Sequence, residues 1–80
     1  MKHPPVTERK LGKHKADGLY WPDTKSIEID PNLKPKRKME VMIHELLHHR
    51  HPDWTEEKVN AEGLYICEFL WKHNYRKVSQ

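Results

Sequence analysis

The sequence predicts a small α+β domain in which a β-hairpin packs against two helices. Two short β-prone stretches, residues 18–21 and 26–30, flank a segment with turn chemistry. A longer stretch, residues 36–51, then runs without glycine or proline, and a second one repeats its apolar residues at helical spacing. A two-stranded ribbon is not stable by itself, so we expect it to pack on the helices.

The size of the chain limits what its core can supply. Its 80 residues make one small domain, with 35% hydrophobic and 34% charged residues. Folds of this size commonly gain stability from disulfides, a metal or oligomerisation. Cys67 is the single cysteine, so no intrachain disulfide can form, and on an apolar segment it is more often a small core residue than a nucleophile. Binding of a metal ion would therefore stabilise the fold.

Charge and hydropathy bear on the cellular location of the protein. The formal net charge of +3 is mild and indicates solubility rather than nucleic-acid binding. No apolar run is long enough to cross a bilayer, and no apolar segment follows the first charged residues as in a secretory signal. With no disulfide possible, these features predict a cytoplasmic protein without a membrane partner.

Residues 1–15 differ in composition from the rest. They combine prolines and many charges with little apolar content, which predicts a flexible basic N-terminal arm ahead of a single domain over 16–80. Its basic residues are Arg9, Lys10, Lys13 and Lys15. A solvated tail is favoured over a phosphate-binding arm.

The hairpin is expected over Gly18 to Trp21 and Ser26 to Asp30. The segment between them contains Pro22, which fixes φ, and Asp23, which can bond nearby backbone. Alternation in the second strand predicts that Ile27 and Ile29 face the helices, with Ser26, Glu28 and Asp30 outward.

The first helix is expected to begin near Lys34 to Lys36, because Pro35 suits a first turn, and to stop before Pro52. The basic cluster of residues 36–38 at its beginning is disfavoured by the helix dipole. This conflict would suit an anionic ligand, although a solvated face is the favoured interpretation.

The second helix is expected to begin after a cap at Asp53 or Thr55 and to run to about His73. Its buried stripe is predicted at helical spacing, with Cys67 and Phe69 alongside. The stripe residues are Val59, Gly63, Ile66 and Leu70.

The first helix carries the sequence His44-Glu45-Leu46-Leu47-His48. Histidines four residues apart lie one turn apart on one helical face, so both imidazoles can reach one metal ion. A glutamate directly after the first histidine can lie beside the metal without ligating it, where it takes a proton from a metal-activated water. A histidine-rich solvated helix end is the alternative, and the apolar neighbours Val41 and Ile43 disfavour it.

A catalytic zinc normally takes a third protein ligand. The short connection at residues 52–54 should fold the second helix back beside the first, which makes its acidic residues the candidates. At about 100° per residue, Glu56 falls on the buried stripe. Glu57 points roughly 100° away, Glu62 lies at the edge of the stripe, and Glu68 faces solvent. A carboxylate on that stripe is costly unless it is paired or binds metal. Glu56 is favoured, with Glu57 and Glu62 left open.

These motifs resemble the very small zincin-like, gluzincin-type HExxH metallopeptidases encoded by bacteriophages, over roughly Gly18 to Tyr75. In several zincin families the third ligand is the first residue of E-x-x-A-[D/N], and Glu56-Glu57-Lys58-Val59-Asn60 is similar except for its valine. The resemblance implies one Zn²⁺ per chain held by His44, His48 and Glu56, and hydrolysis of a peptide or protein with Glu45 as general base. It also implies a host-cell cytoplasmic location. The candidates for stabilising the oxyanion are Tyr20, Tyr65, His49 and His51, and the sequence does not choose among them.

Two other functions stay open. A non-catalytic zinc module would close its metal sphere with a fourth ligand, such as His49 or His51. A nucleic-acid-associated protein would contact phosphates through the basic arm together with Lys34, Lys36, Arg37 and Lys38. The exposed edge of the hairpin could also pair with a second copy to form a homodimer.

Overall fold

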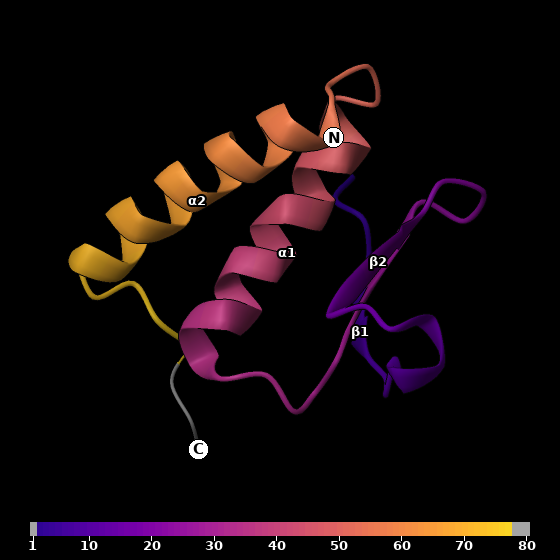
Figure 1. The fold of residues 1–80 in the computed structure, drawn as a ribbon, viewed down its shortest axis with the longest axis horizontal. Coiled ribbons are helices and arrows are strands. Elements are labelled where there is room, and N and C mark those ends of the chain that lie inside the picture. The colour runs from indigo at the N-terminus through magenta and orange to yellow at the C-terminus, as the bar shows by residue number, and fades with distance from the viewer. Residues whose placement is uncertain (1, 78–80) are drawn as a thin grey trace.

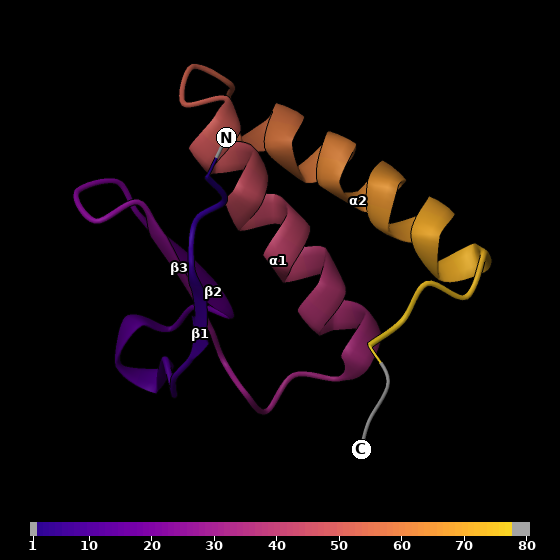
Figure 2. The same ribbon diagram turned by 180° about the vertical axis from the view of Figure 1, so that it is seen from behind.

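The computed structural model describes residues 2–77 and confirms the α+β class. In chain order the elements are β1 (Val6–Glu8), the 3-10 turn η1 (Gly12–His14), β2 (Gly18–Trp21), β3 (Ser26–Ile29), α1 (Pro35–Arg50) and α2 (Glu56–Lys72). Helix α1 lies between the sheet and α2 and contacts both (Figures 1 and 2). The central helix is therefore the element against which α2 and the β2–β3 hairpin are positioned.

The sheet has three strands instead of the expected two, in the order β1-β3-β2. Strands β2 and β3 form the predicted antiparallel hairpin, with Tyr20 opposite Ile27. Strand β1, from the segment predicted to be an arm, pairs parallel with β3 and places Val6 opposite Ile27. All three residues of β1 are exposed, so no apolar alternation marks the strand in the sequence.

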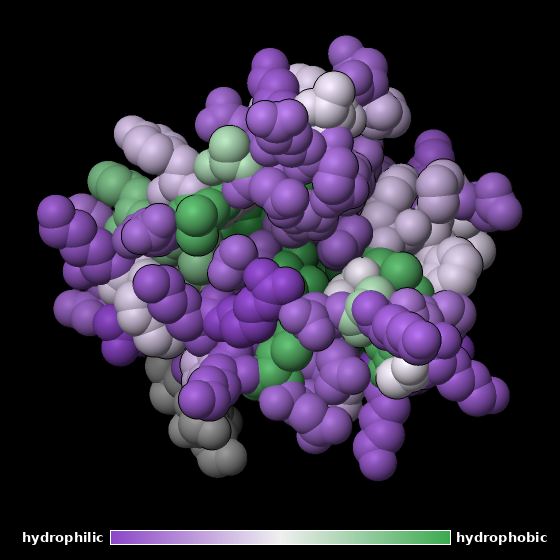
Figure 3. Space-filling model, in the orientation of Figure 1, coloured by the Kyte–Doolittle hydropathy of each residue, from purple (hydrophilic) through white to green (hydrophobic). Residues whose placement is uncertain are grey.

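Leu11 shows that the N-terminal segment also contributes to the interior, because its side chain is fully buried. Ile27 and Ile29 are buried as predicted and form the centre of the core with Val41 of α1. Partly buried apolar side chains surround this centre, namely Tyr20, Leu33 and Leu46. The core is small, and the surface in Figure 3 is mostly hydrophilic with separate apolar patches, one of them over α2.

Helix α1 begins with Pro35 in its first turn, and no side chain caps it. The basic cluster at this end is compensated by acidic side chains from other elements. Arg37 contacts Asp17 at 2.8 Å and Glu40 at 3.1 Å. Lys38 contacts Glu8 at 3.0 Å. These ion pairs offset the unfavourable dipole interaction and tie α1 to the N-terminal segment.

Helix α2 begins after Thr55, whose hydroxyl accepts a hydrogen bond of 3.1 Å from the Lys58 amide. Of the two predicted caps, the structure therefore uses Thr55. The buried line of the helix is Val59, Gly63 and Cys67, so Cys67 is a core residue as expected.

The predicted stripe was wrong at Ile66, which is 38% exposed, and so was the placement of Phe69, which is 60% exposed. The residues of α2 that contact α1 follow a spacing of four, which moves the contact line toward Cys67 and away from Ile66. Within residues 2–77, neither helix is long and apolar enough to cross a membrane.

Candidate active site

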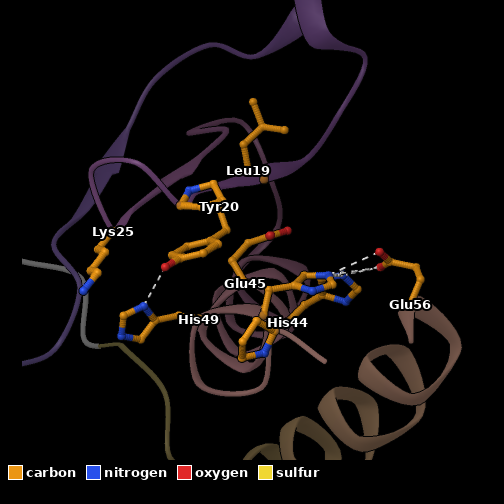
Figure 4. Close-up of a pocket in the computed structure, with 11 residues that line it drawn as sticks. Leu19, Tyr20, Lys25, His44, Glu45, His49 and Glu56 are labelled. Atoms are coloured by element: carbon orange, nitrogen blue, oxygen red, sulfur yellow. Dashed lines mark hydrogen bonds and ion pairs between the residues drawn. The ribbon is translucent and has the colours of Figure 1, made fainter. Parts of the chain in front are cut away.

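His44 and His48 lie one turn apart on α1 with their ring Nε2 atoms 3.2 Å from each other. Glu56, in the first turn of α2, reaches the same point (Figure 4). Its Oε1 lies 2.6 Å from Nε2 of His44 and its Oε2 lies 3.2 Å from Nε2 of His48. Two helices thus bring three side chains together at one place.

The connection between the helices explains why Glu56 arrives there. The Trp54 amide donates a 3.0 Å hydrogen bond to the carbonyl of His51, and the two rings stack with centroids 3.9 Å apart. The Lys58 ammonium lies 4.5 Å from the Trp54 ring centroid, a cation–π contact. Together with the Thr55 cap, these contacts hold the first turn of α2 against the end of α1.

The geometry of this group suits a bound cation. One ligand atom from each of His44, His48 and Glu56 lies within 4.8 Å of the others. Imidazole nitrogens and carboxylate oxygens all carry lone pairs, so their convergence requires either a shared proton or a metal ion between them. Among residues 2–77 the group does not include Glu57 or Glu62.

Glu56 differs in one respect from the prediction. It was expected to be buried, but its side chain is 65% exposed, whereas those of His44 and His48 are 19% and 25% exposed. The reason is that Glu56 lines a cleft that is open to solvent, instead of packing against apolar side chains. The group is therefore accessible from solvent on the carboxylate side.

Glu45 is the one buried charged residue among those described, with 8% exposure. Burial raises the pKa of its carboxyl group, and the positive potential of His44 and His48 opposes that shift. The carboxylate makes no hydrogen bond within residues 2–77 and lies beside the three-residue group in Figure 4. A buried carboxyl group with a raised pKa therefore stands next to the three side chains.

Strand β2 passes very close to Glu45. A Cβ atom at Gly18 would lie 3.4 Å from Glu45 Cγ and 2.3 Å from Val41 Cγ1. Only glycine allows the strand to approach α1 at this level. Gly18 was predicted in a strand, but its close approach to α1 was not, because no local sequence pattern encodes the distance between a strand and a helix.

A cleft of about 770 Å³ opens between β2, the hairpin turn, α1 and the first turn of α2. In the wall of this cleft, the Tyr20 hydroxyl and His49 Nδ1 form a hydrogen bond of 2.8 Å. Lys25 also lines the cleft. A second hollow of about 240 Å³ continues past His44, Glu45 and Glu56 toward Asp17 and Arg37. From the sequence, Lys25 was predicted only as a turn residue.

The remaining candidates separate clearly. Tyr20 and His49 line the cleft, whereas Tyr65 is 75% exposed on α2 and His51 is stacked on Trp54. Neither His49 nor His51 belongs to the group formed by His44, His48 and Glu56 within the described part of the chain.

Comparison with known families adds one finding. Residues 3–63 match the model of the Peptidase_M78 family, described as the IrrE N-terminal-like domain. The match covers more than half of the chain and includes all four residues of the site. No curated protein and no solved structure matches the chain.

Proposed function

The chain belongs to the Peptidase_M78 (IrrE N-terminal-like domain) family, and from that membership and the geometry of its cleft we propose that it is a zinc-dependent metallopeptidase. The observation that carries the proposal is the convergence of His44, His48 and Glu56 beside the buried Glu45. Membership of a peptidase family agrees with the metallopeptidase-like character that the motif implies. Zinc and the individual catalytic roles are the proposed part.

The ligand set and its spacing support zinc. Two imidazoles and a carboxylate form a common ligand set of catalytic zinc, which leaves one position for substrate or water. The Nε2 atoms of His44 and His48 are 3.2 Å apart. Glu56 lies 2.6 Å from His44 Nε2 through its Oε1 and 3.2 Å from His48 Nε2 through its Oε2. His44, His48 and Glu56 would hold the ion.

Glu45 would act as the general base. When bound, zinc supplies Lewis-acid polarisation of the scissile carbonyl and lowers the pKa of water. Glu45 would accept a proton from the attacking water as its oxygen forms a bond to the carbonyl carbon. It would then give that proton to the leaving amine as the C–N bond breaks.

Strand β2 would align the substrate. It is an outer strand of the β1-β3-β2 sheet, and its residues 18–20 line the cleft. An extended peptide can pair with an open strand edge, which places its backbone alongside the cleft. The Tyr20–His49 pair would bound the peptide on the side away from Glu56.

The test has two stages, metal content and hydrolysis. We expect about one zinc per chain in the wild type and its loss in Glu56→Ala. Glu57→Ala is the matched control, because Glu57 is the next residue of the same helical turn and lies outside the group. Glu45→Gln should keep zinc and lose about 10²- to 10⁴-fold in the rate of cleavage of a mixed peptide pool.

Each outcome has a separate meaning. A wild type without zinc would refute the proposal outright. Equal zinc loss in the Glu56 and Glu57 variants would remove Glu56 from the ligand set. Retained zinc with no hydrolysis by the wild type would assign the chain to the non-catalytic zinc modules.

A further inference from the structure

The cleft has two chemically different ends. One end holds His44, His48 and Glu56, with Glu45 beside them. The other end holds Lys25 and the hydrogen-bonded pair of Tyr20 and His49. Figure 4 shows Lys25 and the Tyr20–His49 pair on the side of Glu45 away from Glu56.

Lys25 is the cation of this second end. It stands in the turn between β2 and β3 with φ of 52°, in the left-handed region that is costly for a residue with a Cβ. Within residues 2–77 its side chain makes no hydrogen bond or ion pair. The turn therefore holds an exposed positive charge at the cleft that no described residue pairs with.

Arg37, at the opposite hollow, provides the contrast. Its guanidinium contacts Asp17 at 2.8 Å and Glu40 at 3.1 Å, so its charge is already neutralised by the protein. An acidic ligand group would find no free partner there. The groove across the site is thus electrostatically one-sided, with its available cation at the Lys25 end.

We infer that Lys25, with the Tyr20–His49 pair, forms a subsite for a carboxylate of the substrate. This inference rests on the proposed function and specifies its substrate class as peptides carrying an acidic side chain or a free C-terminal carboxylate near the scissile bond. The Lys25 ammonium offers three donors. When His49 carries its proton on Nδ1, it donates to the Tyr20 oxygen, and the Tyr20 O–H is left to donate to the carboxylate.

The experiment compares matched peptides on wild type and two variants. One peptide sequence is prepared with glutamate or glutamine at a single position, and each version with a free or an amidated C-terminus, so that the two sources of carboxylate are separated. Lys25→Glu reverses the charge of the subsite. Lys15→Glu is the matched control, because Lys15 is also an exposed lysine with a left-handed φ, of 49°, and does not line the cleft.

In wild type and Lys15→Glu, we expect kcat/KM to be about fivefold higher for a carboxylate-bearing peptide than for its neutral partner, as for a partly exposed ion pair. The difference should appear in one of the two comparisons, glutamate against glutamine or free against amidated C-terminus. The preference should decline with added salt. In Lys25→Glu it should disappear or reverse. A preference unchanged in Lys25→Glu, or lost equally in Lys15→Glu, would overturn the inference.

Peptide binding separates this inference from the proposed function. The same peptides are titrated against Glu45→Gln and against Glu45→Gln combined with Lys25→Glu, using fluorescence anisotropy. If wild type cleaves no peptide but the first variant prefers the carboxylate and the second does not, the peptidase proposal fails and the subsite stands. If wild type cleaves all versions equally, the peptidase stands and the subsite fails. Absence of both cleavage and binding would overturn both.

Discussion

Gly18→Ala should destabilise the protein more than any other single added methyl group near the site. The new Cβ would lie 2.3 Å from Val41 Cγ1 and 3.3 Å from the Glu28 carbonyl oxygen. Carbon atoms in contact need about 3.5 Å, so β2 and α1 would have to separate by about 1.2 Å (3.5 − 2.3). Val41 has little freedom to avoid the contact, because it is 4% exposed and a β-branched residue in a helix has one strongly preferred rotamer.

Overpacking of this kind typically costs about 1–3 kcal/mol. A loss of about 2 kcal/mol in the free energy of unfolding would lower Tm by roughly 10 °C in a domain of this size. The assay is urea denaturation followed by circular dichroism, with chelator present so that metal binding does not contribute.

Gly63→Ala is the control with the opposite expectation. A Cβ there would lie 3.7 Å from His44 Cα and 3.7 Å from Leu47 Cδ1, which is ordinary contact. Removing glycine from a helix interior should then stabilise the protein by up to about 1 kcal/mol. The double variant of Gly18→Ala and Val41→Ala should be less destabilised than the sum of the single variants. Equal stability of Gly18→Ala and wild type, or simple additivity with Val41→Ala, would refute the steric argument.

Two further predictions concern the parts that surround the site. Thr55→Ala should remove the hydrogen bond to the Lys58 amide and lower the free energy of unfolding by about 1 kcal/mol in the same urea assay; an unchanged value would show that the cap is not needed to start α2. The hydrogen bond and charge of Lys38 lower the pKa of Glu8 below its ordinary value of 4.5. The folded state therefore favours the charged carboxylate, and this stabilisation is present above pH 4.5 and is lost as the pH falls through the lower folded pKa. Glu8→Gln should flatten this acidic part of a plot of stability against pH, and an identical slope in wild type and variant would exclude the ion pair as its source.

The features that sequence analysis predicted well depend on local geometry. The spacing of His44 and His48 needs only the helix repeat to place both rings on one face. Pro35 and the Thr55 cap mark where the two helices begin for reasons contained in a few residues each. Glu56 was favoured over its acidic neighbours by helical phase and by the resemblance to the E-x-x-A-[D/N] motif, and the structure places it with the two histidines, although exposed rather than buried.

The features that were missed depend on contacts between elements. Strand β1 is recognisable only through its partner β3, since its own residues are all exposed. Ile66 is exposed, contrary to the prediction, because α2 meets α1 along a line that runs through Gly63 and Cys67. Tyr20 and His49 are 29 residues apart in the chain, and no short pattern connects them. Their selection from the four oxyanion candidates as cleft residues required the fold.

Two glycines on different elements, Gly18 of β2 and Gly63 of α2, lie close to α1 at Glu45 and His44. Gly18 of β2 brings the strand to 3.4 Å from Glu45 Cγ, measured from the position of an added Cβ, and Gly63 of α2 comes to 3.7 Å from His44 Cα by the same measure. A side chain at the first position would push away the strand that buries Glu45. A large side chain at the second would push away the helix that carries Glu56. A core this small buries too little apolar area to hold its elements together by that alone. Tight packing of the backbone at Gly18 and Gly63 adds to the contacts between the elements. The arrangement explains how Glu45 stays buried while His44, His48 and Glu56 stay together within one helical turn of it.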